Sequence, residues 1–219
     1  MRFVTEVWQL VRKEAVLEIR QKYALNGILL YVLSTVFVTY LAFDRIIQPS
    51  TWNALFWIIM LFAAVNAVSK SFVQESQGRH LYYFNLASPL SIITSKMIYN
   101  GLLMMMLGAL NLFIFVLLMD HFVQHWTYFI LNLMLGCVGL SGLLTMIAAI
   151  SARTNNNFSL MAILSFPIVL PLLLTLIRAS GAALETVWTP APSLMLAIGL
   201  LSILPAALAL LLYPYLWQD

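Results

Sequence analysis

The stretch MIYNGLLMMMLGALNLFIFVLLM, residues 97–119, decides the fold, because it contains no charged side chain. A helix needs about 20 predominantly apolar residues to cross a bilayer, whereas membrane barrels consist of short alternating strands. Five further charge-free runs of similar or greater length are Tyr23–Phe43, Ile46–Ser69, His121–Ala152, Thr154–Ile177 and Thr186–Gln218. The sequence therefore predicts an all-α, polytopic membrane protein with six transmembrane helices.

The overall composition supports this fold class. Of 219 residues, 63% are hydrophobic and only 9% are charged, whereas soluble domains are about half apolar and a quarter charged. We therefore exclude a soluble enzyme or nucleic-acid-binding protein and expect residues 1–219 to form one transmembrane domain. The one cysteine, Cys137, lies within a charge-free run, so neither an internal disulfide nor a Cys-x-x-Cys metal site is possible.

The distribution of lysine and arginine predicts the orientation, because these residues accumulate in cytoplasmic loops. Nine of the eleven lie in three segments: before the first charge-free run, between the second and third runs, and between the fourth and fifth runs. Only Arg45 and Arg178 lie on the opposite side. Both termini are therefore expected in the cytoplasm. Tryptophans near the predicted span ends are expected at the membrane interface: Trp52, Trp126, Trp188 and Trp217.

Residues 1–22 have the pattern of an amphipathic helix that lies in the cytoplasmic interface. Its predicted apolar face consists of Val4, Val7, Trp8, Val11, Ala15 and Ile19. Polar residues occupy the opposite face, and Glu18 interrupts the apolar one. Two roles fit this helix: a surface anchor that orients the first span, or an elbow helix that moves with a cytoplasmic partner.

The cytoplasmic segment 70–96, KSFVQESQGRHLYYFNLASPLSIITSK, is longer than most loops, and long loops are usually functional or disordered. It contains too many aromatic and aliphatic residues to be a solvated linker. Gly78 can end one helix and Pro89 can begin the next. The exposed aromatics, rimmed by Glu75, Arg79 and His80, predict a protein contact, although the same side chains would also fit the headgroup region.

The predicted spans contain no Asp, Glu, Lys, Arg or His well inside them, which argues against an ion-coupled secondary transporter. Their polar residues are expected to form hydrogen bonds mostly between helices: Asn66, Asn111, Asn132, Ser141, Thr145, Ser165 and Thr175. Gly136, Gly139 and Gly142 recur every three residues and permit close helix packing. Pro167 and Pro171 share one face of the fifth span, where they form either a hinge or a re-entrant break.

No catalytic, cofactor-binding or metal-binding residue is assigned. No glycine is followed by lysine, so the chain has no phosphate-binding loop, and any use of ATP requires another chain. His121 and His125, with Asp120, have the spacing of a metal or haem site. It is commoner for two histidines in a short loop to have ordinary hydrogen-bond partners, and we expect that arrangement here.

Three stretches together resemble the CcmB family, the permease subunits of the ABC complex in cytochrome c maturation, and more broadly type-2 ABC exporters. VRKEAVLEIRQKYALNG (11–27) resembles the family's opening helix, and FVQESQGRHLYYFNLASPLSIITSK (72–96) resembles its coupling loop. LSFPIVLPLLLTLI (164–177) resembles its fifth span, with the proline pair four residues apart.

The resemblance implies that ATP acts through a separate CcmA-type ATPase and that haem is handled by the complex, in the bacterial inner membrane. It implies a homodimer and further partners of the CcmC, CcmD and CcmE types. The ATPase would dock on the Gln74–Leu86 region. The residues assigned to coupling on this basis are Phe72, Gln74, Glu75, Gly78, Arg79, Leu81, Pro89 and Lys96. Two alternatives stay open: an exporter of a lipid, glycan or drug, and a non-conducting scaffold of the maturation complex.

Overall fold

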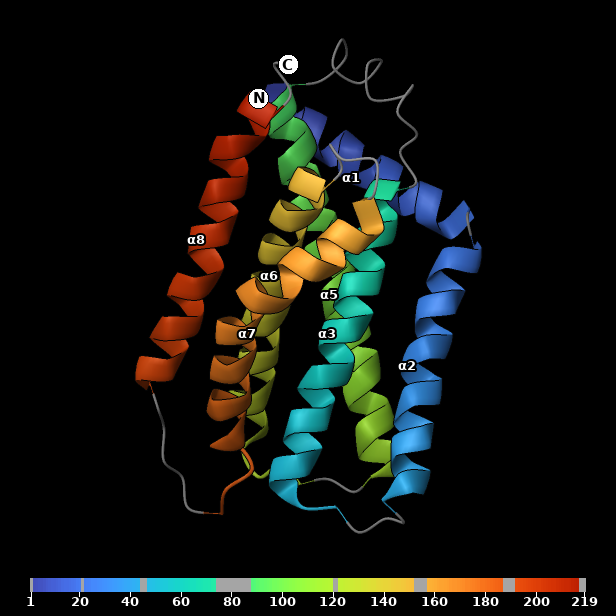
Figure 1. Ribbon diagram of the computed structural model, residues 1–219, viewed down its shortest axis with the longest axis vertical. Coiled ribbons are helices and arrows are strands. Elements are labelled where there is room, and N and C mark those ends of the chain that lie inside the picture. Colours follow the sequence, from blue (N-terminus) through green and yellow to red (C-terminus); the bar gives the residue numbers. More distant parts are fainter. Residues whose placement is uncertain are drawn as a thin grey trace.

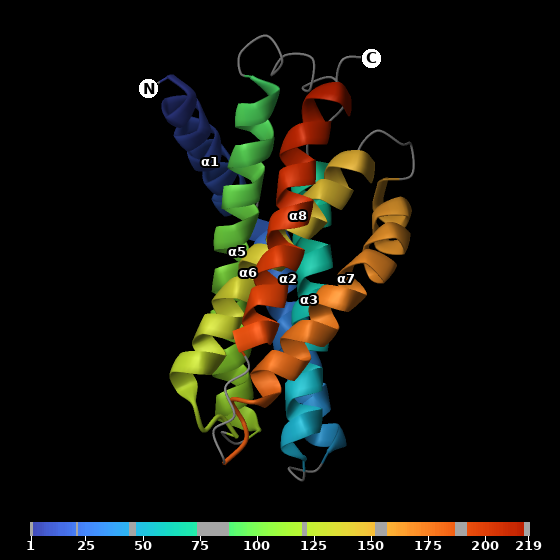
Figure 2. The same cartoon turned by 90° about the vertical axis from the view of Figure 1, so that its left-hand side faces the viewer.

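The computed structural model describes residues 2–20, 22–43, 47–73, 88–119, 122–151, 157–186 and 192–216. These residues form seven helices: α1 (Arg2–Arg20), α2 (Lys22–Ala42), α3 (Pro49–Val73), α5 (Pro89–Leu118), α6 (Trp126–Ser151), α7 (Asn157–Gly181) and α8 (Pro192–Leu216). Six of them run side by side as a bundle, and α1 lies across one end of it, here called the α1 end (Figure 1). The first residues of α1 and the last residues of α8 both lie at the α1 end (Figure 2).

Five of the six predicted spans are confirmed as helices that are long and apolar enough to cross a bilayer. They are Pro49–Ser69, Pro89–Leu118, Trp126–Ser151, Ile163–Gly181 and Pro192–Tyr215. The apolar part of α2, Asn26–Ala42, is shorter, so its status as a sixth span stays a prediction. The chain is therefore an all-helical, multi-pass membrane protein.

Helix α5 begins earlier than the charge-free run suggested. Its N-cap is Ser88, whose hydroxyl accepts a hydrogen bond from the Ser91 amide, and Pro89 stands in the first turn. Proline fits that position because its missing N–H would have no helical partner there. Residues 89–96, placed in the coupling segment by sequence, thus form two helical turns continuous with the span.

The middle of the bundle is built around α6, the span with the largest buried share. A Cβ atom at Gly136 would lie 2.6 Å from the Trp57 ring, and one at Gly139 would overlap the Ser202 hydroxyl of α8. The predicted use of these glycines in close helix packing is therefore confirmed. Trp52, by contrast, was expected at the interface but is 0% exposed, with its ring 5.3 Å from that of Phe115. Position near a span end does not determine which way a side chain faces.

Hydrogen bonds between helices also follow the prediction in part. Asn111 Nδ2 donates to Phe56 O, Ser141 Oγ to Met97 O, and Asn100 Nδ2 to Thr145 Oγ1. The prediction is wrong for two residues, because Asn66 and Thr175 bond to carbonyls of their own helices, Phe62 O and Pro171 O. A polar side chain on a helix can always reach the carbonyl four residues earlier, so its type alone does not reveal an interhelical bond.

Candidate functional site

The joint between α1 and α5 is the candidate functional site, because it contains charged side chains buried between two helices. The apolar face predicted for α1 is divided in the structure. Val7 and Val11 are buried, whereas Val4, Trp8 and Ile19 are exposed. The buried stripe of α1, which includes Val7 and Val11, thus lies to one side of the predicted apolar face. The other buried residues of this stripe explain the difference.

Two carboxylates complete this stripe. Glu14 and Glu18 are both buried, and with Val7 and Val11 they follow the spacing of one helical face. Glu18 is predicted from the sequence as an interruption of the apolar face, and Glu14 has no predicted role there. An acidic residue at a buried helical position is a signal for a partner, because a buried charge is costly unless it is paired.

The partners of these carboxylates are on α5. Lys96 Nζ lies 3.5 Å from Glu14 Oε1, and the Lys96 side chain is only 1% exposed. The Tyr99 hydroxyl donates a hydrogen bond to the Glu18 carboxylate. On the more accessible side, Lys13 Nζ lies 3.0 Å from Glu14 Oε1, with its side chain 25% exposed. The Glu14 carboxylate therefore lies between one buried and one partly exposed ammonium group.

A third contact joins the beginnings of the two helices. Ser91 Oγ donates to Glu6 Oε2 at 3.1 Å and lies 2.7 Å from the Ser88 hydroxyl, the N-cap of α5. The first residues of α5 are thus linked to α1 by the same group of side chains that fixes where α5 begins. Together, the three contacts run along α1 from Glu6 to Glu18.

The structure places the predicted coupling residues in three groups. Gln74, Glu75, Gly78, Arg79 and Leu81 lie outside the described residues. Phe72 belongs to the last turn of α3, and Pro89 to the first turn of α5, so both flank the predicted coupling loop.

Lys96 forms the third group. The resemblance assigns Lys96 to coupling, and in the structure its side chain is buried against Glu14 of this chain. A role of Lys96 in coupling to a partner stays a prediction.

The proline pair lies inside α7, which continues as one helix from Asn157 to Gly181 and bends along its length (Figure 1). Hydrogen bonds fix the part of α7 that follows Pro171: Asn132 Nδ2 donates to Leu176 O at 3.1 Å and Asn53 Nδ2 to Ile177 O at 2.7 Å. The structure therefore shows a bent helix rather than a break, and a hinge role for Pro167 and Pro171 stays a prediction.

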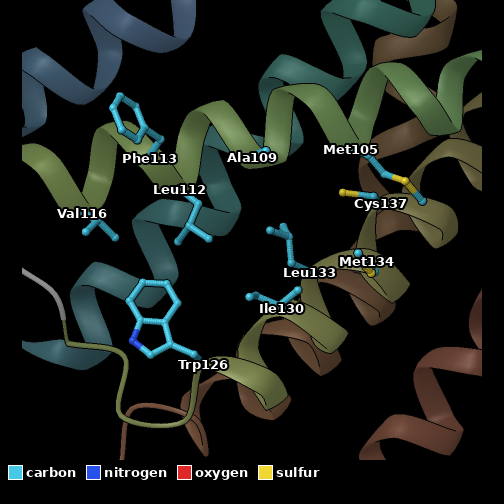
Figure 3. A pocket seen from close by; sticks show the side chains of 10 residues that line it. All are labelled: Met105, Ala109, Leu112, Phe113, Val116, Trp126, Ile130, Leu133, Met134 and Cys137. Atoms are coloured by element: carbon cyan, nitrogen blue, oxygen red, sulfur yellow. The ribbon is translucent and has the colours of Figure 1, made fainter.

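A cavity of about 410 Å³ lies between α5 and α6 (Figure 3). Its lining is apolar apart from the Trp126 indole and the Cys137 thiol, and includes Met105, Leu112 and Met134. Such a cavity suits a hydrocarbon chain better than a charged solute.

The predicted histidine pair is only partly described. His121 lies outside the described residues, and the His125 amide donates to Ala183 O at 3.0 Å. Within the described part of the chain, no group of three or more histidine, cysteine or acidic side chains is placed to hold a metal ion.

Comparison with known proteins agrees with the sequence resemblance. A search of curated proteins found no match. Residues 5–213 match the family described as CcmB protein. Because this match covers nearly the whole chain, the chain belongs to the CcmB family, whose members are membrane permease subunits in cytochrome c maturation rather than catalytic subunits.

Proposed function

We propose that this chain couples ATP hydrolysis by a separate CcmA-like ATPase to haem delivery and to release of the haem-loaded chaperone. The observation that carries the proposal is the α1–α5 joint, in which the buried pair Glu14–Lys96 connects the two helices, in a chain that belongs to this family. Helix α3 ends and α5 begins at the α1 end of the bundle, so the predicted coupling segment between them starts and finishes at this end (Figure 1). A partner that pushes there acts on α1, α3 and α5 together.

The α1 end faces the cytoplasm in this proposal. Nine of the eleven Lys and Arg residues belong to segments predicted on that side, and positive charge is retained in the cytoplasm. The first residues of α1 and the last residues of α8 lie at this same end. The ATPase, which needs cytoplasmic ATP, would therefore meet the coupling segment of a chain inserted in the bacterial inner membrane.

The remaining partners follow from the family. Two copies of the chain would pair with two ATPase subunits, and closure of the ATPases would move the membrane domains as rigid bodies. CcmC- and CcmD-like subunits would deliver haem to a CcmE-like chaperone, which is released on the outer side. In this proposal haem is the cargo of the complex. This chain transmits the force generated by the ATPase and does not itself bind haem.

The first experiment is a haem stain for covalent c-type cytochromes in cells that lack this chain. Loss of the stained bands, restored by the wild-type gene, supports a role in maturation. Unchanged bands would contradict that role and direct the search to an exported lipid, glycan or drug, for which the apolar cavity between α5 and α6 is the natural starting point. Maturation that persists with an ATPase-dead partner would instead identify a scaffold.

A second experiment tests the coupling segment. Replacing Glu75 and Gly78 together with alanine should uncouple the ATPase from maturation without preventing insertion, because neither residue lies in a predicted span. Insertion is measured by membrane fractionation, and coupling by haem staining against ATPase activity of the purified complex. Normal ATPase binding and normal staining in this variant would remove the segment as the docking site.

A further inference from the structure

We infer that α1 and the first three turns of α5 move as one rigid body, with Glu14 and Lys96 as the positioning residues that hold them in register. The inference rests on the proposed function, because it states how a push on the α1 end reaches a membrane-spanning helix. It assigns to Lys96 a role inside this chain in place of direct contact with a partner.

The first support is the number and spread of the polar contacts. Three pairs join the helices: Glu6 with Ser91, Glu14 with Lys96, and Glu18 with Tyr99. At 1.5 Å per residue, they extend over about 18 Å of α1 and about 12 Å of α5. Neither helix can slide along the other or rotate about its own axis without breaking at least one pair.

The second support is the burial of the central pair. Apolar contacts such as those of Val7 and Val11 are non-directional and permit small shifts in register. The Lys96 side chain is 1% exposed, so separation from Glu14 would remove a counter-ion from a charge that water does not reach. A buried polar pair of this kind can specify a single register between two helices, which is the best supported use of buried ion pairs.

The third support is the sequence distance between the partners. Helix α1 is followed almost directly by α2, yet the contacts of its carboxylates go to α5, 85 positions away in the case of Glu6 and Ser91. Through these contacts α1 is fixed to the helix that begins where the predicted coupling segment ends. A force applied to α1 or to the end of the predicted coupling segment is therefore delivered to the same transmembrane helix, α5.

The test compares two variants matched in chemistry. In one, Glu14→Met is combined with Lys96→Met, because replacing both members of a buried pair by apolar residues usually preserves folding. The control is Lys13→Met, which removes the other ammonium group near the same carboxylate, but one that is 25% exposed. The double variant should assemble with the ATPase and hydrolyse ATP but lose most haem staining, whereas the control should stain like wild type.

A distance measurement tests the rigid body directly and does not depend on haem. Spin labels are placed on the exposed residues Gln9 of α1 and Ile98 of α5, after Cys137, the chain's one cysteine, has been replaced by serine. In the purified complex, the distance between the labels should be narrowly distributed and unchanged by ATP. In the Glu14→Met/Lys96→Met variant it should become broad.

The outcomes separate this inference from the function on which it rests. A shift of the Gln9–Ile98 distance with ATP, or a narrow distribution in the double variant, overturns the inference and leaves the function intact. Wild-type haem staining of the double variant does the same. Unchanged staining in cells that lack the chain altogether overturns the proposed function, whereas the distance measurement would still report whether the two helices form one body.

Discussion

The two ends of the bundle are held together by different chemistry. At the α1 end, α1 is joined to α5 by the buried pair Glu14–Lys96. At the opposite end, α3 is joined to α7 by neutral groups: Trp57 Nε1 donates to Ser180 Oγ at 2.8 Å, and Ser180 Oγ donates to Asn53 Oδ1 at 2.7 Å. Neutral hydrogen bonds cost little to bury when they are complete, whereas a charge pair is tolerated only with its partner present. The α1 end therefore includes a buried charge pair among its contacts, whereas the contact between α3 and α7 at the opposite end is made by neutral hydrogen bonds.

The largest expected effect therefore comes from breaking the charge pair on one side. Lys96→Met should destabilise the protein by about 3 kcal/mol, because the buried Glu14 carboxylate loses its buried counter-ion. Thermal unfolding of the purified protein in detergent measures this loss. The matched change Lys13→Met should cost about 1 kcal/mol or less. Equal effects of the two substitutions would show that burial of Lys96 does not matter.

A smaller effect is expected at the opposite end. Ser180→Ala removes the acceptor of the Trp57 N–H and the donor to Asn53 Oδ1, while the contact from Asn53 Nδ2 to Ile177 O remains. We expect a loss of about 1–2 kcal/mol in the same unfolding assay. Ser34→Ala is the control, since the Ser34 hydroxyl is exposed and donates a hydrogen bond to Tyr31 O of its own helix. A loss as large as that of Lys96→Met would make the two ends equivalent.

The smallest effect on stability, but not on activity, is expected between the two ends. Pro167→Ala combined with Pro171→Ala restores two backbone donors to α7 and should straighten the helix. If the bend is a hinge, assembly stays normal while haem staining falls, and the two are measured in the same cells. Pro205→Ala, in α8, controls for loss of a proline from another span. Failure of insertion or dimerisation would show that the proline pair is structural.

The helices could be predicted from sequence because a bilayer imposes a length and an absence of charge that are visible in a single chain. The same criterion places the start of the α5 span after Lys96, whereas the prediction that Pro89 begins a helix is confirmed. Trp52 was misplaced because distance from a span end does not indicate the direction of a side chain.

The candidate site could be predicted only in part. Periodicity places Glu14 and Glu18 on one face of α1, but it does not reveal which of the other helices that face will meet. The pairing of Glu14 with Lys96 depends on the tertiary arrangement of α1 across the bundle, and that arrangement has no counterpart in local sequence pattern. The proline pair is the reverse case, because its effect on the backbone is local and the bend follows from the residue type.

The long sequence separation within the α1–α5 joint has a consequence for biosynthesis. Glu6 is translated 85 residues before its partner Ser91, and Glu14 similarly precedes Lys96. At 5–20 residues per second, α1 waits roughly 4–17 s on the nascent chain before α5 is made. During this interval its carboxylates must remain hydrated, so α1 stays outside the hydrocarbon while α3 is inserted. Docking of α1 then marks the moment at which the amino-terminal half of the protein is complete.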